Sequence, residues 1–402
     1  MSITVSGITP GSTHLSGNDI MVKLTTNGFP LNEMDYKLLL KITSPDGVLD
    51  GAPFIPAITP NAAGEATFNL SGYVDQYFEK LFTWPIIGLF DGKLIGWVNG
   101  SYTLVLYPGE SWISKTDGSL EENFGEAFQP VFIVKGKLPK IMLAQLNDAQ
   151  TTWFDEYCIG GKFFSFMPLV QLITPYQPVK LWWIPPELMN DVNILITHYI
   201  GGISDTTVIL HGALYYDILW EIECHAVNLG IPLEDEQGNK LEKYTIWIEH
   251  NAVEVTEKRT FIIDWNPPHQ DYYYLFVENR MGGIETIGLT GRKIFKPSGD
   301  RILSKRPFVQ DSGILFPTQL SVSAQRKRKW TINSGWKPKE ELMALDFLLD
   351  AQHAWLALPP STGSVNIADY TLCPVIITNT ELILNDDTKI IESIDIDLEE
   401  AY

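Results

Sequence analysis

The stretch that decides the fold is LWEIECHAV, which occupies residues 219–227. Its apolar side chains alternate with Glu221, Glu223 and His225, and a period of two places successive side chains on opposite faces of a β-strand. One face of this strand is expected to pack against a core, whereas the acidic face is expected to meet water or a partner. The stretch therefore predicts a half-buried strand in an antiparallel sheet.

Composition favours a mainly β fold for the whole chain. Of its 402 residues, 45% are hydrophobic and 12% are aromatic, and flat aromatic rings fit the pleated surface of a sheet. A chain of this length is usually divided into two or three domains. The three cysteines, Cys158, Cys224 and Cys373, lie far apart in the sequence and predict no disulfide framework.

The net charge and the N-terminal residues argue against nucleic acid and membranes as partners. A formal charge of −20, from 29 basic and 49 acidic side chains, repels phosphate backbones and argues against general nucleic-acid binding. The first residues lack the basic and apolar regions of a signal peptide, and no stretch reaches about 18 uninterrupted apolar residues. We therefore expect synthesis without a standard export signal, and no membrane partner.

Residues 1–138 are predicted to form an N-terminal β-sandwich of the immunoglobulin or fibronectin type. Short β-type runs alternate there with turn signals such as Asn27-Gly28 and Asp91-Gly92, which supply the backbone angles of tight reversals. One short helix is expected at residues 73–82. The domain is expected to end at Leu138-Pro139, because proline restricts the residue before it and a strand must stop there.

The rest of the chain is predicted to hold two more units. Residues 139–312 form a central β-sandwich or barrel in this interpretation, beginning with a strand at Phe163 to Phe166, and residues 297–313 are interpreted as a loop. Residues 313–402 form a strand-helix-strand unit that packs with the central domain. Its helix follows Pro338, whose missing N–H donor costs nothing in a first turn, and leucines recur at helical spacing. These leucines are Leu342, Leu345, Leu348 and Leu349.

No motif in the sequence predicts catalysis. It holds no phosphate-binding glycine loop, HExxH, CxxC or GxSxG, the patterns typical of nucleotide, zinc and serine-hydrolase sites. Glu221 and Glu223 would suit a glycosidase pair, but acids on the open face of a strand are commonly there for solvation. Cys224 and His225 would need His250 to hold zinc, although adjacent strand residues point to opposite faces. We expect no enzyme, no cofactor and no metal site.

A basic segment inverts the sign of the chain between residues 291 and 330. It holds ten Lys or Arg residues against Asp300 and Asp311. Three interpretations stay open: a charged edge strand that prevents unwanted pairing, docking onto an acidic neighbouring subunit, and, least favoured, nucleic-acid binding. The candidate interface residues here are Arg326, Lys327, Arg328 and Lys329, and a second copy would offer Asp395, Asp397, Glu399 and Glu400 as their acidic counterpart.

Clusters of adjacent aromatic residues supply further candidate interface positions. Adjacent strand residues face opposite ways, so one member of each cluster is expected in the core and its neighbour at the surface or at an interface. Exposed Tyr and Trp suit both protein contacts and sugar stacking. The clusters are Trp182-Trp183, Tyr215-Tyr216 and Tyr272-Tyr273-Tyr274, of which Trp182, Trp183, Tyr272, Tyr273 and Tyr274 are the candidate interface residues.

Several structural motifs lie between residues 138 and 402, and they include Phe163-Phe164-Ser165-Phe166-Met167-Pro168, Tyr274 to Thr286 with its Gly282-Gly283 turn, Arg328-Lys329-Trp330-Thr331, and Cys373-Pro374-Val375-Ile376-Ile377. By these motifs, residues 138–402 resemble a group of virion proteins found in phages and prophages of Bacteroidetes. The last two motifs look like the closing unit of phage tail or baseplate components. None of these motifs names a catalytic residue.

The resemblance implies a virion structural protein, most consistent with a tail or baseplate component. Such a protein would form a symmetric homo-oligomer, contact other virion or tail subunits, and be made in the cytoplasm of the bacterial host before assembly into the virion. The alternative is a carbohydrate- or receptor-binding protein whose aromatic strands contact a host-surface glycan. A glycan-cleaving enzyme that uses Glu221 and Glu223 is the least favoured hypothesis.

Overall fold

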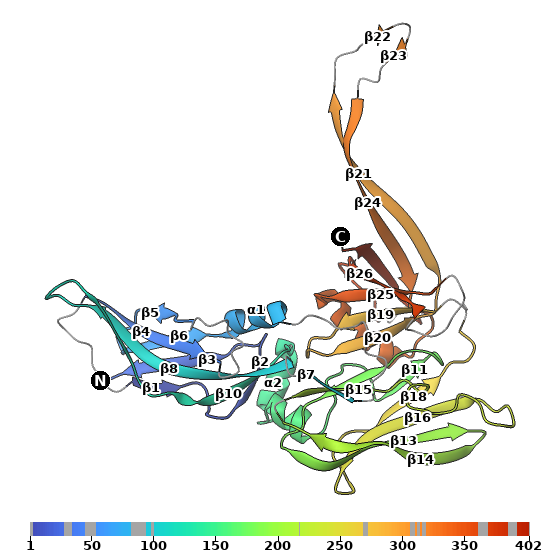
Figure 1. Cartoon of the computed structure of the whole chain (residues 1–402), viewed down its shortest axis with the longest axis horizontal. Coiled ribbons are helices and arrows are strands. Elements are labelled where there is room, and N and C mark those ends of the chain that lie inside the picture. Colours follow the sequence, from blue (N-terminus) through green and yellow to red (C-terminus); the bar gives the residue numbers. More distant parts are fainter. Residues whose placement is uncertain are drawn as a thin grey trace.

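The computed structural model describes residues 3–27, 34–44, 54–81, 94–97, 100–216, 218–267, 272–305, 310–311, 314–315, 319–360, 369–384 and 392–401. The chain is mainly β, as predicted. The N-terminal strands form one end of an elongated body and the later strands form the other end (Figure 1). A long hairpin projects away from the body at that second end.

Two sheets packed on each other form the N-terminal part. One has the strand order β1-β3-β6 and the other β2-β10-β8-β4-β5, with β9 paired to β8. Alternate side chains of both sheets, including Leu24, Leu40 and Ile133, share one buried core, which is the arrangement of a β-sandwich. The strands are β1 (Ile3–Ser6), β2 (Thr13–Leu15), β3 (Met21–Thr26), β4 (Met34–Thr43), β5 (Ala57–Ile58), β6 (Glu65–Asn69), β8 (Ser101–Ile113), β9 (Leu120–Phe124) and β10 (Phe128–Val134).

Two more sheets form the central part. One has the order β11-β18-β16-β13-β14, with β17 paired to β16, and the other has the order β12-β15-β7. Trp183 and Ile222 of the second sheet share a core with Ile194 and Ile246 of the first. The strands are β7 (Leu94–Trp97), β11 (Val170–Ile173), β12 (Lys180–Trp183), β13 (Met189–Ile200), β14 (Ile203–Leu214), β15 (Leu219–Glu223), β16 (Leu241–His250), β17 (Val253–Glu254) and β18 (Arg259–Ile263).

The last sheet has the order β20-β19-β25-β26-β27-β24-β21. Both faces of its β19 are buried, because Leu275 belongs to one core and Tyr274 and Phe276 to another that includes Trp182 of the central part. The strands are β19 (Tyr273–Glu278), β20 (Ile284–Leu289), β21 (Lys293–Lys305), β24 (Gln319–Asn333), β25 (Ala354–Leu358), β26 (Thr371–Ile377) and β27 (Asp395–Glu400), and β22 (Gln310–Asp311) pairs with β23 (Ile314–Leu315).

The helices are short. The predicted N-terminal helix is confirmed as α1 (Ser71–Leu81), and the predicted leucine-rich helix is present as α3 (Lys339–Ala344) followed by a 3-10 helix, η3 (Leu345–Asp350). The sequence did not predict α2 (Lys140–Asp148), which Pro139 begins, or the π-helical turn η2 (Asp155–Ile159). None of the helices in the described residues is long and apolar enough to cross a membrane.

Three predictions about local structure differ from what the structure shows. Phe163 to Phe166 is not a strand: its backbone is irregular, although Phe163 and Phe164 enter two different buried cores. Residues 297–305 are strand instead of loop, since β21 continues through Lys305, and Gln310–Asp311 form β22; the other residues of the predicted loop lie outside the described residues. The boundary predicted between residues 312 and 313 falls inside one hairpin, and β7 pairs with β15 across the boundary predicted at residue 138.

Candidate functional site

The projecting hairpin is the most distinctive feature of the surface. Strands β21 and β24 pair from Lys293 with Ile332 to Lys305 with Gln319, and they are much longer than the usual five or six residues. Among the described residues, β27 joins β24 only from Lys329 to Asn333. The two-stranded ladder from Pro297 to Lys305 therefore spans about 30 Å without a third strand.

Two of the basic residues at the base of this hairpin form salt bridges within the chain. Lys327 Nζ and Lys329 Nζ each lie 2.7 Å from Glu399 of β27. Hydrogen bonds from the two lysines hold the pKa of Glu399 below its usual value. Arg328 is exposed on the opposite side of the strand, as the alternation of a strand requires. The side chain of Arg326 lies outside the described residues.

These contacts bear on two interpretations of the basic segment. Strand β24 has β21 on one side, but β27 flanks its other side only from Lys329 to Asn333, so Arg326, Lys327 and Arg328 lie where that edge pairs with no described strand. The acidic C-terminal strand is already the partner of β24 inside the same chain, since Thr331 Oγ1 donates to Asp397 at 2.6 Å and Asn333 Nδ2 donates to Asp395 at 2.8 Å. Docking of the basic segment onto that strand in a second copy would require these contacts to break.

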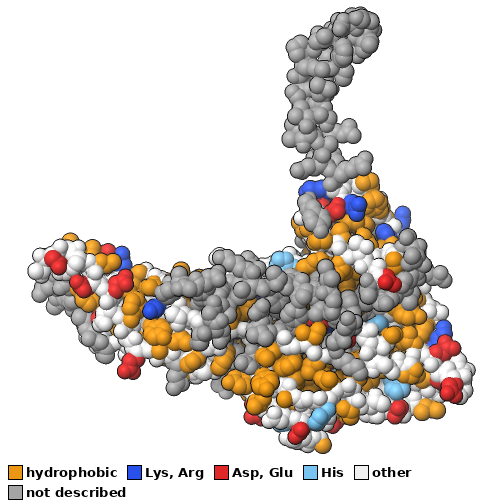
Figure 2. Space-filling view, viewed as in Figure 1, with side chains coloured by type: hydrophobic (Ala, Val, Ile, Leu, Met, Phe, Trp, Pro, Cys, Tyr) orange, Lys and Arg blue, Asp and Glu red, His pale blue; other side chains and the backbone are white. Residues whose placement is uncertain are grey.

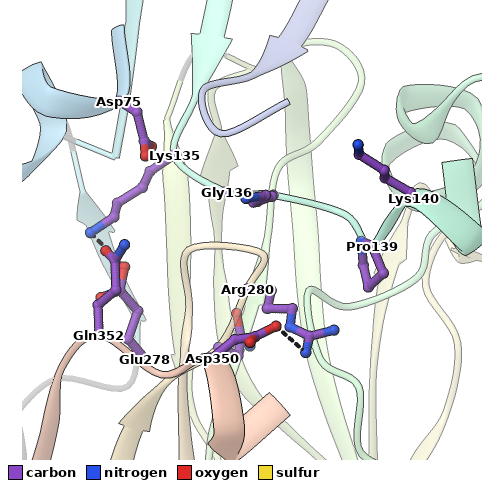
Figure 3. A pocket seen from close by; sticks show the side chains of 11 residues that line it. Asp75, Lys135, Gly136, Pro139, Lys140, Glu278, Arg280, Asp350 and Gln352 are labelled. Carbon is purple, nitrogen blue, oxygen red and sulfur yellow. Dashed lines mark ion pairs between the residues drawn. The ribbon is translucent and has the colours of Figure 1, made fainter. Parts of the chain in front are cut away.

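A second site lies where the N-terminal sandwich meets the last sheet. Lys135, just after β10, pairs with Glu278 of β19 at 2.5 Å, and these side chains are 6% and 9% exposed. Arg280, in the β19–β20 turn, pairs with Asp350 at the end of η3. These pairs line a pocket of about 520 Å³ (Figure 3). In the close-up, Lys135 reaches to Glu278, whereas Lys140 lies on the other side of the view, beside Pro139.

Glycines bring the two backbones of this junction together. Gly282 has φ +87°, and a Cβ there would lie 2.2 Å from the carbonyl oxygen of Lys135. A Cβ on Gly136 would lie 2.8 Å from the backbone of Met281. Only glycine fits both the positive φ and the close approach. The N-terminal sandwich is thus held against the last sheet by backbone contact and by a buried ion pair.

The acidic pair of the central strand is buried, which corrects the prediction of a solvated face. Glu221 and Glu223 are each 1% exposed. Their sheet, β12-β15-β7, packs against the other central sheet, β11-β18-β16-β13-β14, on one face and against the last sheet on the other face. Lys180 of β12 contacts Glu221. Burial raises the pKa of Glu223 to about 7, while burial lowers the pKa of neighbouring His225 to about 4. At this depth the two carboxylates have no route to a substrate in the described structure.

The aromatic clusters also differ from expectation. Trp182 and Trp183 are both buried, at 2% and 0% exposure, because each face of β12 meets a core. Their indole nitrogens donate to the carbonyl oxygens of Ile284 at 3.1 Å and Tyr157 at 3.3 Å. The prediction that one member of each pair is exposed is wrong here.

The tyrosine clusters divide differently. Tyr274 is buried and Tyr273 is 8% exposed, whereas Tyr272 is half-buried. By contrast, Tyr215 and Tyr216 are 50% and 47% exposed. The exposed aromatic surface therefore lies at a cluster that the candidate interface did not include.

The described residues hold no group of three or more His, Cys, Asp or Glu side chains suited to a metal ion. Cys224 is fully buried, and burial raises its pKa well above the usual value, so its thiol is poorly disposed to ionise as a ligand. Cys158 and Cys373 are buried free thiols as well.

Comparison of the sequence with models of known protein families and with curated proteins finds no match.

The residues of the junction do not stand out in the sequence as a site. Lys135 directly follows the apolar run of β10, and Glu278 and Arg280 precede the Gly282-Gly283 turn. The sequence offers two signals for this junction: a lysine at the end of one apolar strand and a carboxylate at the end of another. Their pairing was not predictable, because the two segments are more than a hundred positions apart in the sequence.

Proposed function

We propose that this chain is a structural subunit of a homo-oligomeric virion assembly, as a component of a phage tail or baseplate. The observation that carries the proposal is the projecting β21–β24 hairpin (Figure 1). A two-stranded ribbon is marginally stable by itself in water. Such an arm gains stability when it lies against a neighbouring subunit, and its free backbone edge can extend a neighbour's sheet.

The body of the molecule is suited to carry such an arm. The sandwich and the last sheet are joined by a buried ion pair and by close glycine contacts, so that forces on the hairpin are borne by a rigid support. Phe295, at the base of β21, is 51% exposed while its ring lies 5.9 Å from that of buried Trp330. An exposed aromatic ring beside exposed Arg328 is the composition of a protein contact surface.

The resemblance of residues 138–402 to virion proteins of Bacteroidetes phages is the reason to place this assembly in a tail or baseplate. Partners in this proposal are further copies of the chain and adjoining tail subunits. The role requires no cofactor and no catalytic step, in keeping with the burial of Glu221 and Glu223.

The proposal is tested on the purified chain and on particles. Sedimentation velocity over a range of concentrations and electron microscopy are expected to show a ring or a stack of defined subunit number. Mass spectrometry of purified particles from a host that encodes the chain is expected to detect it in multiple copies. A strict monomer that is absent from particles would overturn the proposal.

A charge reversal gives a matched test of the contact surface. Arg328→Glu is expected to weaken assembly by placing an acid among the exposed groups of a strongly acidic protein. Lys258→Glu is the control. Lys258 is exposed on the central part of the chain, and its replacement also exchanges a positive charge for a negative one. Equal assembly of both variants would show that Arg328 is not at the contact.

A further inference from the structure

A groove at a second junction has the composition of a ligand site. It has a volume of about 610 Å³, within the range of pockets that hold small ligands. One wall is the edge of the N-terminal sandwich around Thr13 and Phe132, and the other is α2 with the segment that follows it, around Trp153. Figure 2 shows hydrophobic side chains gathered on the part of the body that carries α2, β13 and β15 in Figure 1.

Charge is missing from the lining of this groove. Of the described residues that line it, none is Asp, Glu, Lys or Arg, although such residues make up 19% of the chain. The lining offers hydroxyl, amide and imidazole groups instead, including those of Ser12, His14 and Asn147. Burial lowers the pKa of His14, which favours the neutral form of its ring.

Fixed aromatic rings complete the surface. Tyr216 is 47% exposed, and its ring meets Phe132 edge to face at 6.0 Å and 83°. Trp153 donates its indole N–H to the carbonyl oxygen of Thr13 at 3.2 Å, which ties the two walls together. Phe154 meets Trp153 edge to face. The groove is therefore shaped before any ligand arrives, which limits the ordering cost of binding.

We infer that this groove binds a neutral oligosaccharide. A sugar ring offers an apolar face to an aromatic side chain such as Tyr216, and its hydroxyls exchange hydrogen bonds with neutral polar groups. A charged ligand would lose its hydration without finding a counter-charge. A wholly apolar ligand would cover the hydroxyl, amide and imidazole groups of the lining without exchanging hydrogen bonds with them.

The inference does not depend on the proposed assembly role. Sugar binding by a strict monomer would support the groove and count against the assembly, whereas assembly without sugar binding would support the assembly and overturn the groove. In a virion subunit, the groove would give the particle a contact with neutral surface glycans of a cell.

The test is titration calorimetry of the full chain with neutral hexaoses built from glucose, galactose, mannose or N-acetylglucosamine. At least one is expected to bind with a Kd below about 1 mM. Tyr216→Ala is expected to weaken that binding about tenfold, because the stacking face is lost. Tyr215→Ala is the control, since Tyr215 is equally exposed and adjacent but does not line the groove, and it is expected to bind as the wild type does.

A sulfated form of the bound hexaose is expected to bind more weakly than the neutral one. Three results would overturn the inference: no hexaose binds below about 1 mM, the two tyrosine variants lose affinity equally, or the sulfated form binds more tightly. Binding of an apolar dye displaced by no sugar would also contradict it.

Discussion

The junction and the base of the hairpin contain the same chemistry in opposite surroundings. Lys135 and Glu278 pair at the junction with 6% and 9% of their side chains exposed, whereas Lys327 and Glu399 pair at the hairpin with 37% and 16% exposed. A buried pair cannot exchange its partner without exposing a bare charge, but an exposed pair exchanges readily with water or another protein. The junction is built to stay closed, and the hairpin base is built to accept contacts.

The largest expected effect comes from breaking the buried pair. Glu278→Gln removes the carboxylate that neutralises the buried ammonium of Lys135, and we expect the free energy of unfolding to fall by about 3–5 kcal/mol. Urea unfolding followed by tryptophan fluorescence measures this change. The double variant Lys135→Met with Glu278→Leu, which removes both charges, is the control and is expected to lie much closer to the wild type. A fall of less than about 1 kcal/mol in the free energy of unfolding for Glu278→Gln would mean that the junction pair contributes no more than an exposed ion pair such as the one at the hairpin base.

The next effect concerns Glu223, a buried acid whose loss of hydration outweighs the attraction of Lys180 and the hydrogen bond from the backbone N–H of His225. The folded-state pKa of Glu223 is raised to about 7, so its contribution to stability is present below its unfolded pKa of about 4.5 and is lost as the pH rises to about 7. Glu223→Gln does not titrate, and we expect it to gain about 3 kcal/mol relative to the wild type between pH 4.5 and pH 8.

His225 changes the free energy of unfolding of the wild type with pH in the opposite direction to Glu223. Its pKa is lowered to about 4, so its contribution rises with pH between about 4 and 6.5. That contribution is common to the wild type and to Glu223→Gln, and the difference between their urea curves isolates Glu223. A constant difference across this pH range would contradict the raised pKa.

A smaller loss of stability is expected when the junction glycine Gly282 is replaced, and a matched glycine distinguishes a steric clash between the two backbones from strain due to a positive φ. Gly282→Ala places a Cβ against the carbonyl oxygen of Lys135 in addition to its positive φ, and we expect a loss of about 2 kcal/mol or more. Gly202→Ala is the matched control, because Gly202 has φ +78° and open space where the Cβ would be. Equal losses in thermal unfolding would mean that the close approach of the two backbones contributes nothing.

The smallest effect is expected at the hairpin base. Glu399→Gln removes the common partner of Lys327 and Lys329, yet we expect the free energy of unfolding to fall by less than about 1 kcal/mol. Raising the salt concentration is expected to shrink the difference further, because exposed charges are screened. A loss as large as that of Glu278→Gln would remove the contrast between the two regions.

The alternation in residues 219–227 correctly predicted a strand, but not which face is wet. That outcome depends on a third layer, the β19–β20 part of the last sheet, which covers Glu221 and Glu223 and leaves no trace in their local pattern. Strand β24 was predictable from its composition. Its partner β21 was not, because Pro297 indicates a loop, whereas an edge strand tolerates a proline that donates no ladder hydrogen bond.

The candidate sites were less predictable than the strands. The run of basic residues marked the base of the hairpin, since a charge cluster is local in the sequence. The junction and the groove combine segments that are distant in the sequence, such as Thr13 with Trp153, and no local pattern predicts such pairings. The exposed pair Tyr215-Tyr216 was visible as an aromatic cluster, but only its position on the surface distinguishes it from buried Trp182-Trp183.

The central claim is that the hairpin is the assembly element and the body its rigid support. Its most direct test shortens the arm by replacing residues 301–324 with Asn-Gly, a two-residue turn that matches the pairing of Asp300 with Gln325. We expect an unchanged thermal unfolding midpoint, with loss of the oligomer in sedimentation velocity and of the ring or stack in electron microscopy. A shortened chain that unfolds normally and still assembles as the wild type does would contradict the claim.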